Sequence, residues 1–528
     1  MRNFHLPGRS PVLAVNGMVA TSHPLAAAEA LSVLKDGGNA ADAAIAGAVL
    51  LGVCEPQMTG LGGDCFALVK PAGTDSVVAL NGSGRAPAGI DTDAARAEGL
   101  TRLPPGHPGS ITVPGAVDAL CQLSTRFGKA GLDRALAPAI RYFEDGVPVA
   151  PRVAFDYPRA EAPMTEATRQ HYLNDNRPYA MGEVLRLPGQ AEVLRRVARD
   201  GAKAFYEGEI ADDMLAALDA IGASHTAEDF ATTQSDWNDP VAGPYRGHDL
   251  IEHPPNGQGA TAILLAGILA RFDLSSMDPN GAQRLHIEAE ATKLAYDARN
   301  RFLSDPDHMT RLDHMLSPDT ARTLAGLIDP ARAMAAPAPL TEDVHKDTIL
   351  ITVVDSDGMA VSLIYSIFAT FGSGVSSPKF GILLHNRGSG FNLIPGHPNE
   401  AAPGKRPMHT IIPAMRATAG RIDMAFGVMG GQYQATGHAH ILSNLVDYGM
   451  DPQEAIDAPR AFADPMTGKL RIEDGLSDAT LSDLSALGHD LIRQEDPIGG
   501  AQAIMMDHAR GLLVAGSDPR KDGCALGY

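Results

Sequence analysis

The amino-acid sequence predicts a mixed α/β (α+β) protein, and two features of the chain carry this prediction. The N-terminal and middle parts hold Ala- and Leu-rich segments between helix start and stop signals. From residue 348 onward, the pattern changes to short runs of β-branched and apolar residues separated by turns. One Ala/Pro-rich stretch before this change is the only linker-like segment in the 528 residues.

Two helices are expected near the N-terminus. The first covers residues 24–35, with Ser22 as a possible N-cap and a Gly-Gly stop signal behind it. The second runs from residue 40 to about residue 53 and is capped by Asn39. It is apolar on all sides, which is typical of a helix buried inside a large protein.

The segment that follows is glycine-rich, GLGGD at 60–64, and leads into a strand at 65–69. Further along, residues 282–303 have the composition of a long helix that ends before an Asp-Pro pair. The linker-like stretch, residues 329–343, is rich in Ala and Pro, and we expect an exposed, mobile loop there.

A β-hairpin is the first element expected after this loop. Residues 348–355 and 359–367 are rich in β-branched and apolar side chains, and Ser-Asp-Gly at 356–358 supplies the turn. Further elements expected in this part are a strand at 381–384, a strand at 422–428, a helix at 432–448 closed by Gly449, and a helix that starts at 451–454.

Charge and hydropathy exclude several classes of protein. Lys and Arg total 43 and Asp and Glu total 63, so the formal charge is −20, which argues against a nucleic-acid partner or a polybasic membrane anchor. The longest nearly uncharged apolar run, residues 43–54, is shorter than the about 20 residues of a spanning helix. The N-terminus shows no signal-peptide pattern, so we expect a cytoplasmic protein.

Motifs for cofactors and metals are incomplete in this sequence. GLGGD does not complete GxGxxG because Cys65 takes the last position, and no GxxxxGK[ST], HExxH or GxSxG pattern occurs. His438 and His440 lie two residues apart on an expected helix and so point in different directions. The four cysteines are scattered and form no CxxC pair. We therefore expect no cofactor and no metal.

The junction of the Ala/Pro-rich loop with the hairpin, at Asp347-Thr348, is where we expect chemistry. A threonine hydroxyl is a weak nucleophile that needs a base. Cleavage of the chain before Thr348 would free an α-amine on the same residue, with a pKa near about 7.7–8.0. Taken alone, a threonine that opens a strand is most often structural.

A second candidate feature is Gly430-Gly431, at the junction of an expected strand and helix. Glycine lets backbone N–H groups approach a ligand closely, and a helix N-terminus adds positive potential. The pair could therefore form an oxyanion hole. In isolation, a tight packing turn is the more common reason for two such glycines.

These residues lie within nine ordered blocks of sequence that resemble the γ-glutamyltransferase family of N-terminal-nucleophile hydrolases, nearly from end to end. The blocks are GGNAADAAIAGAVLLGVCEPQMTGLGGD (37–64), PPNGQGATAILLAGIL (254–269), TVVDSDGMAVSLIYS (352–366), FGSG (371–374), GILLHN (381–386), APGKRPMHTIIPA (402–414), FGVMGG (426–431), DYGMDPQEAIDAPR (447–460) and SDPRKDGCALGY (517–528).

The resemblance implies an αββα four-layer sandwich made as one precursor that cleaves itself between Asp347 and Thr348. A large fragment, residues 1–347, and a small fragment, residues 348–528, would together build a single fold. Thr348 matches the family's nucleophile, and Ser366 matches the hydroxyl that orients it. Gly430 and Gly431 match the oxyanion-hole pair.

The sequence departs from the family where γ-glutamyl enzymes hold the substrate's α-amino and α-carboxylate groups. Ser83 replaces an arginine, although Arg85 lies two residues away, and Phe368 replaces an asparagine. A glutamine and an aspartate become Arg387 and Gly390, and two serines become His409 and Thr410. These replacements resemble the branch that contains cephalosporin acylases and oxamate amidohydrolase.

The replacements change the expected substrate. Arg387 repels an α-ammonium group but suits a carboxylate, and Phe368 favours an apolar or planar acyl group. We therefore expect an autoprocessed Thr-nucleophile amidohydrolase or acyltransferase whose substrate is a small-molecule amide with an acidic acyl group.

Two alternatives stay open. One is a γ-glutamyl hydrolase or transpeptidase for glutathione-like compounds, with Arg85 holding the α-carboxylate. The other is an uncleaved, catalytically silent member of the family. The expected partners are the two fragments of the precursor, and the processed unit could form a homodimer.

Overall fold

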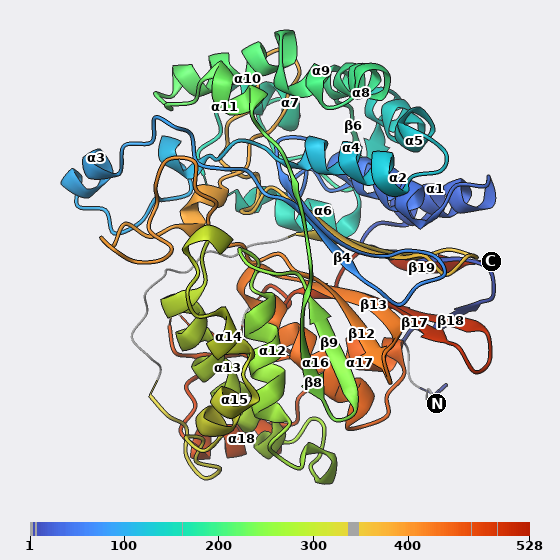
Figure 1. The fold of residues 1–528 in the computed structure, drawn as a ribbon, viewed down its shortest axis with the longest axis vertical. Helices are drawn as coiled ribbons and strands as arrows, with labels where there is room; N and C mark the ends of the chain where they lie inside the picture. The colour runs from blue at the N-terminus through green and yellow to red at the C-terminus, as the bar shows by residue number, and fades with distance from the viewer. Residues whose placement is uncertain (1–3, 6–7, 161, 336–347, 466, 494) are drawn as a thin grey trace.

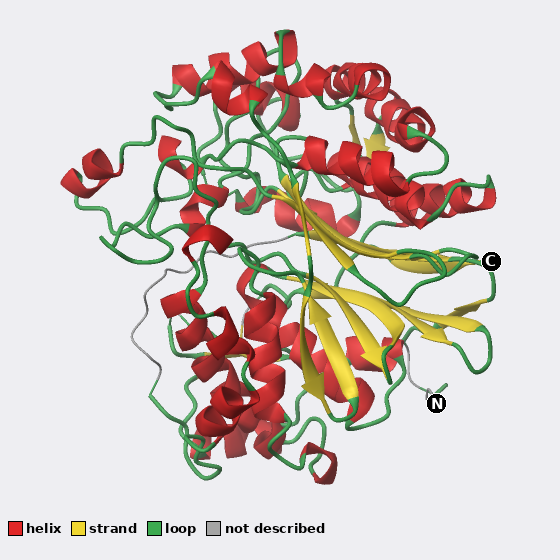
Figure 2. Ribbon diagram, in the orientation of Figure 1, coloured by secondary structure: helices red, strands yellow, loops and turns green. Residues whose placement is uncertain are grey.

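The computed structural model describes residues 4–5, 8–160, 162–335, 348–465, 467–493 and 495–528. Within these residues, two seven-stranded sheets stack face to face, and helices cover the outer face of each sheet (Figures 1 and 2). The layers follow the order helix, sheet, sheet, helix. The αββα sandwich implied by the family resemblance is therefore confirmed.

Both sheets combine strands from distant parts of the chain, and neighbouring strands in them are antiparallel. In spatial order, the first sheet contains β1 (Val12–Ala14), β18 (Leu512–Ser517), β17 (Gly500–Asp507), β13 (Arg421–Met429), β12 (Pro413–Thr418), β9 (His248–Glu252) and β8 (Val241–Tyr245). The second contains β19 (Cys524–Gly527), β2 (Met18–Thr21), β10 (Ile349–Val354), β11 (Ala360–Ser366), β3 (Asp64–Lys70), β4 (Val78–Gly82) and β7 (Asp236–Asn238). Shorter strands are β14 (Ala461–Ala463), β15 (Leu470–Ile472), β16 (Leu491–Arg493), β5 (Val147–Pro148) and β6 (Val184–Leu185).

The helices form the two outer layers. The layer over the second sheet includes α1 (Pro24–Lys35), α2 (Ala40–Cys54), α4 (Ala116–Phe127), α5 (Leu132–Asp145) and α8 (Pro188–Asp200). The layer over the first sheet includes α12 (Gly259–Leu269), α13 (Ala282–Phe302), α15 (Pro318–Ala325), α16 (Gln434–Val446), α17 (Pro452–Asp457) and α18 (Asp478–Ala486). The remaining helices are α3 (Thr92–Ala97), α6 (Pro151–Asp156), α7 (Glu166–Tyr172), α9 (Lys203–Tyr206), α10 (Glu209–Ala220), α11 (Ala227–Ala231) and α14 (Leu312–Leu316).

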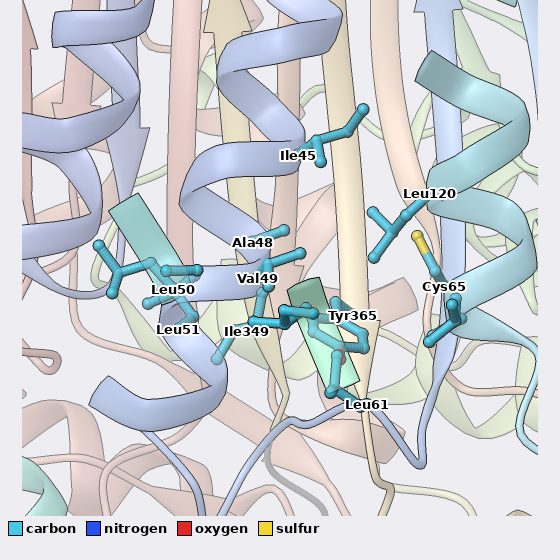
Figure 3. Close-up of a cluster of buried hydrophobic side chains, with 14 of the residues drawn as sticks. Ile45, Ala48, Val49, Leu50, Leu51, Leu61, Cys65, Leu120, Ile349 and Tyr365 are labelled. Carbon is cyan, nitrogen blue, oxygen red and sulfur yellow. The ribbon is translucent and has the colours of Figure 1, made fainter. Parts of the chain in front are cut away.

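Apolar side chains fill the spaces between these layers. Ile45 and Val49 of α2 pack with Ile349 of β10 and Tyr365 of β11 (Figure 3). Between the two sheets, alanines of both sheets pack with methionine, leucine, isoleucine and valine side chains. The all-round apolar α2 is fully buried, as its composition predicts.

The predicted hairpin is confirmed as β10 and β11, and it lies in the middle of the second sheet. β10 also pairs with β2, and β11 also pairs with β3. Strands from both sides of residue 348 therefore form one continuous sheet. Because β10 has a paired strand on each side, it is a central strand of the sheet, and Thr348 and Ile349 at its start are buried.

Local capping rules predicted most helix starts correctly. Asn39 caps α2 in a capping box with Asp42, and Asp451 caps α17 in the same way with Glu454. The prediction for α1 was wrong, since His23 caps it through its ring nitrogen. The Ser22 hydroxyl instead bonds the buried Glu55 carboxylate, a long-range contact that outweighs the local cap.

Two other expectations need correction, and a third lies partly outside the described residues. Residues 381–384 form no strand but only isolated bridges to Gly62 and Ser376. The helix expected at 432–448 begins at Gln434, after a 3₁₀ turn. The loop expected at 329–343 lies partly outside the described residues, as does Asp347. Among the residues described, no helix is both long and apolar enough to span a bilayer.

Candidate active site

Strand register brings Thr348 and Ser366 together. In the β10–β11 pair Ile349 lies opposite Tyr365, so the residue before β10 faces the last residue of β11. Both side chains are buried, and Thr348 Oγ1 lies 3.3 Å from Ser366 Oγ. The predicted nucleophile and the predicted orienting hydroxyl are thus in direct contact.

The Ser366 hydroxyl is held by two further donors. The Phe368 N–H donates to Ser366 Oγ over 3.0 Å, and Arg387 Nη2 donates to it over 3.2 Å. Since Ser366 Oγ already accepts two N–H groups, its own proton is the one available to Thr348 Oγ1. This bond fixes the direction of the Thr348 hydroxyl.

Arg387 is a fully buried cation beside Ser366, the residue that contacts Thr348. It begins a 3₁₀ turn at Arg387–Gly390, and its Nη1 donates to Thr410 Oγ1 over 3.3 Å. The carbon of its guanidinium lies 4.1 Å from the centre of the Phe368 ring, a cation–π contact. Burial lowers the pKa of Arg387 to about 9, and the nearby Asp64 carboxylate opposes this shift. Arg387 thus remains a cation at neutral pH.

Phe368 takes a backbone conformation that is uncommon for its residue type. Its φ is +82°, in the left-handed region, where a bulky residue costs on the order of 1–3 kcal/mol. The contact of its N–H with Ser366 Oγ and the Arg387 guanidinium over its ring hold it there. This conformation places the flat apolar surface of the ring against the Arg387 guanidinium.

Gly430 and Gly431 form a sharp turn between β13 and the start of α16. Their φ values are +118° and +54°, and a Cβ on Gly430 would lie 2.6 Å from the Gly499 Cα. Glycine is thus required at 430 by conformation and by space. The oxyanion-hole role of the pair stays a prediction, which the turn at the helix start favours.

His409 and Thr410 line the same interior. The His409 ring lies 4.9 Å from the Phe66 ring, and its Nε2 lies 3.3 Å from Asp64 Oδ2. Burial first, and then the Arg387 cation, hold the pKa of His409 well below its usual value. His409 is therefore a neutral imidazole, and Thr410 is joined to the site by Arg387.

Arg85 lies in a different environment. Its side chain is 44% exposed, and Nη1 donates to the Gly404 carbonyl over 3.0 Å. Carboxylates of Asp236 and Asp305 lie 3.8 and 3.7 Å from its guanidinium. These acids already balance its charge, and a substrate-binding role for Arg85 stays a prediction.

Sequence reasoning missed Asp64 and His385, two fully buried residues of the site. Asp64 Oδ1 accepts the Gly84 N–H over 2.9 Å, while Oδ2 lies 3.1 Å from His385 Nδ1. Arg387 Nε lies 3.7 Å from the same oxygen. For Asp64, the sequence did carry a signal: it is the acid that ends the glycine run GLGGD. In the structure it is the first residue of β3 and is buried.

The residues described include one trio with metal-ligand spacing, His286, Glu290 and His489. Its atoms already contact protein groups: His286 Nδ1 lies 2.8 Å from His489 Nε2, and the Glu290 oxygens accept from Lys293 Nζ and the Met334 N–H. His438 and His440, judged unsuitable from their spacing, contact separate carboxylates.

Comparisons with known proteins agree with this geometry. The model of the gamma-glutamyltranspeptidase family matches residues 26–528. A glutathione hydrolase-like YwrD proenzyme of Bacillus subtilis is 35% identical, covering 98% of this chain and 99% of its own length. An oxamate amidohydrolase proenzyme of Klebsiella pneumoniae is 34% identical, with the same shares covered.

A solved structure extends the agreement to three dimensions. The crystal structure of a cephalosporin acylase from Bacillus halodurans matches with a TM-score of 0.92 and 36% identity, covering 100% of this chain and 99% of that one. Sequence and fold agree over the whole length, and relatives of this kind are amide hydrolases and acylases. The chain therefore belongs to the gamma-glutamyltranspeptidase family of N-terminal-nucleophile enzymes.

Proposed function

We propose that this protein is an autoprocessed amidohydrolase that uses Thr348 to cleave the amide of a small acidic acyl group. The contact chain from Thr348 Oγ1 through Ser366 Oγ to Arg387 Nη2 carries the proposal. It sets a buried cation next to the nucleophile's own hydrogen-bond partner. A carboxylate is the group that such a cation binds best.

The expected reaction is acyl transfer to Thr348. Its hydroxyl attacks the amide carbonyl carbon, and the hydroxyl proton passes to the α-amine that cleavage has freed. The N–H groups of Gly430 and Gly431 stabilise the oxyanion. The C–N bond then breaks, and the leaving amine takes the proton. Water attacks the resulting ester, the α-amine accepts a proton from it, and the Thr348 hydroxyl is restored.

Short distances favour a short acyl group. Arg387 Nη2 and Thr348 Oγ1 both contact Ser366 Oγ, so their separation cannot exceed the sum of 3.2 and 3.3 Å. A carbonyl at Thr348 and a carboxylate at Arg387 must then lie only a few bonds apart. The Phe368 ring, stacked on the guanidinium, provides a flat apolar wall for such a group.

The site lacks an acceptor for an α-ammonium group at residue 390, where γ-glutamyl enzymes are expected to carry an aspartate. A Cβ at Gly390 would lie 2.5 Å from the Met408 carbonyl oxygen, so a larger residue does not fit there without a backbone shift. Arg387 would repel an ammonium group nearby. Both observations weigh against a γ-glutamyl substrate.

Autoprocessing is the first step of the proposal. Several relatives are named as proenzymes, which supports cleavage of this chain between Asp347 and Thr348. The Thr348 hydroxyl would attack the carbonyl carbon of Asp347, and the C–N bond would break in an N→O shift that leaves an ester and frees the α-amine. Water would then hydrolyse the ester, which releases the Asp347 carboxylate and restores the Thr348 hydroxyl. Because β10 and β11 pair with β2 and β3, the two fragments should stay associated.

A panel of 4-nitroanilides tests the substrate class. We expect the oxalyl and glutaryl anilides to be cleaved faster than the γ-glutamyl and butyryl anilides. Arg387→Met should remove the preference for the acidic anilides, whereas the control Arg85→Met should keep it. Preference for the γ-glutamyl anilide, together with its loss in Arg85→Met, would instead establish the γ-glutamyl alternative.

Mass spectrometry tests processing in the same preparations. The wild type should yield fragments 1–347 and 348–528 that elute together, and Thr348→Ala should yield one intact, inactive chain. An intact wild-type chain that cleaves none of the anilides would identify a silent family member.

A further inference from the structure

A buried arginine lies close to the glycine turn between β13 and α16. Arg299, near the end of α13, is 1% exposed. Its Nη1 donates to Gln258 Oε1 over 3.0 Å and also to Gln432 Oε1. Its Nε and Nη2 donate to Asn300 Oδ1 over 3.1 and 2.9 Å. Each of these acceptors is a neutral amide oxygen, so the hydrogen bonds hold the guanidinium without balancing its charge.

Arg299 differs in this respect from the other deeply buried arginines. Three of these have a carboxylate at 2.5 to 3.7 Å: Arg284 with Glu288, Arg387 with Asp64 and Arg460 with Asp518. In the part of the chain that the structure describes, no acid forms such a pair with Arg299. Burial lowers its pKa to about 10, so it still carries its charge at neutral pH. An unbalanced buried cation lowers stability, so we expect Arg299 to have a role outside stability.

One side-chain amide connects this cation to the glycine turn. Gln258 accepts from Arg299 at Oε1 and donates through Nε2 to the Gly431 carbonyl over 3.2 Å. The same Nε2 donates to the Thr410 carbonyl over 2.7 Å. Donation by the cation to Oε1 strengthens the N–H donors of this amide, because hydrogen bonds in a chain polarise one another. The charge of Arg299 therefore acts on the turn through buried protein, where charges are screened less than in water.

The residue after the glycine pair is held by the same cation, since the Gln432 side chain accepts from Arg299. The glycine pair itself is oriented by the start of the helix, where the Gly430 carbonyl accepts the Tyr433 N–H over 3.0 Å. Because C=O and N–H of a trans peptide point in opposite directions, this bond aims the Gly431 N–H away from α16. The N–H thus points out of a helix start, which is where an anion is stabilised.

We propose that the counter-charge of Arg299 is the oxyanion of the reaction, so that Arg299 is a positioning residue that stabilises the transition state through Gln258 and the glycine turn. In the resting enzyme the cation is unbalanced. Negative charge on the carbonyl oxygen of the substrate balances it when Thr348 Oγ1 bonds to the carbonyl carbon. This inference rests on the proposed function, because it assigns the electrostatic support of the proposed oxyanion hole.

Gln432→Glu tests the inference, because it gives Arg299 a permanent counter-charge at the position of an existing hydrogen bond. The carboxylate keeps the bond to the guanidinium but cancels its charge. We expect kcat for the glutaryl anilide to fall by about tenfold or more, while KM changes little. Formation and hydrolysis of the ester both pass through an oxyanion, so kcat reports on this charge whichever step is slower.

Two further variants separate the charge from the hydrogen bond. Gln432→Met breaks the bond to Arg299 without adding a charge, so it should lower kcat much less than Gln432→Glu does. Gln283→Glu controls for net charge, because it adds an acid at a partly exposed position of the same helix. That position lies about 24 Å from Arg299 along the helix axis, and kcat should stay at the wild-type value.

A boronic acid measures the same effect at equilibrium. Thr348 Oγ1 would add to the boron of 4-boronobutanoic acid while its proton passes to the α-amine, and the tetrahedral boronate anion then mimics the intermediate. Gln432→Glu should weaken inhibition by this acid by a factor similar to the loss of kcat. It should bind glutarate, which forms no oxyanion, with wild-type affinity. Arg299→Met removes the cation itself and should show the same two results.

Either of two results would overturn the inference. The first is wild-type kcat and boronate affinity in Gln432→Glu or in Arg299→Met. The second is a larger loss of kcat in Gln432→Met than in Gln432→Glu, which would mean that the hydrogen bond matters and the charge does not. Rates are compared per processed chain, counted by mass spectrometry, in variants whose thermal unfolding midpoints show that they fold.

Failure of the proposed function looks different. The wild type would then prefer the butyryl or the γ-glutamyl anilide over the glutaryl anilide. The ratio of kcat between Gln432→Met and Gln432→Glu would still be measured on the preferred substrate, because an oxyanion forms on any amide that Thr348 attacks.

Discussion

At the scale of single residues, Ser366 offers the sharpest test of the site. Its hydroxyl contacts Thr348 Oγ1 and accepts from the Phe368 N–H and from Arg387, so Ser366→Ala removes the contact that would orient the proposed nucleophile. A displaced nucleophile lowers the rate about 100-fold, so we expect Ser366→Ala to lower kcat about 100-fold and to change KM little.

Ser362 provides a matched control on the same strand. It is equally buried, but its hydroxyl donates to the Phe426 carbonyl and not to the nucleophile. Ser362→Ala should therefore leave kcat near the wild-type value. Equal losses of kcat in both serine variants, measured by steady-state hydrolysis, would reduce Ser366 to a structural role.

Residue types alone could predict only part of the site. The match to a family motif placed Thr348 and Ser366 correctly beside each other, and charge alone suggested a carboxylate for Arg387. The contact of Asp64 with His385 could not be predicted, because it joins a strand start to a loop more than 300 residues away. Arg85, close to the motif in sequence, turns toward two acids instead.

At the scale of elements, the turn between β13 and α16 should tolerate no side chain. Gly430→Ala would combine a φ of +118° with a Cβ 2.6 Å from the Gly499 backbone. We expect loss of most hydrolytic activity, because the N–H groups of the turn must move. Gly420→Ala is the control, with a φ of +76° and open space, and it should cost only about 1 kcal/mol of stability. Full activity of folded Gly430→Ala would contradict the oxyanion-hole assignment.

The end of α2 carries a buried acid that should make stability depend on pH. Burial raises the pKa of Glu55 to about 7, while the Lys521 charge and the Ser22 hydroxyl oppose the shift. In the unfolded chain this pKa is ordinary, near about 4.3, so the folded state binds the proton more tightly. The resulting stabilisation is full below the unfolded pKa and is lost as pH rises through about 7.

Glu55→Gln removes this titration and keeps a hydrogen-bonding partner for Ser22. Relative to the wild type, the variant should gain unfolding free energy as pH rises from about 4.5 to about 7, by up to about 3 kcal/mol. Urea unfolding of both proteins at several pH values measures the difference. A difference that stays constant with pH would show that Glu55 remains ionised in the fold.

Elements were predictable where their signals are local. Caps and turns predicted α2, α17 and the β10–β11 hairpin, because these signals act within a few residues. Residues 381–384 have strand composition, but the Gly62 and Ser376 backbones contact them only at single bridges. Ser22 does not cap α1, because its hydroxyl donates to the Glu55 carboxylate, which packing brings near. Long-range packing thus decides the cases that composition cannot.

At the scale of the whole molecule, the formal charge of −20 opposes the proposed substrate. An anionic amide must approach through a repulsive field before it meets Arg387, which is buried and acts only at short range. Salt shortens the reach of such a field from about 30 Å at 0.01 M to about 8 Å at 0.15 M. Repulsion between exposed charges is therefore screened more strongly than the buried attraction.

Steady-state hydrolysis at these two ionic strengths tests whether the net charge of the protein repels the anionic substrate. For the oxalyl anilide, kcat/KM should rise by about two- to fivefold with salt, and for the neutral butyryl anilide it should stay constant. The ratio of the two removes any general effect of salt on the enzyme. A fall of the ratio with salt would mean that a positive surface around the site draws the substrate in.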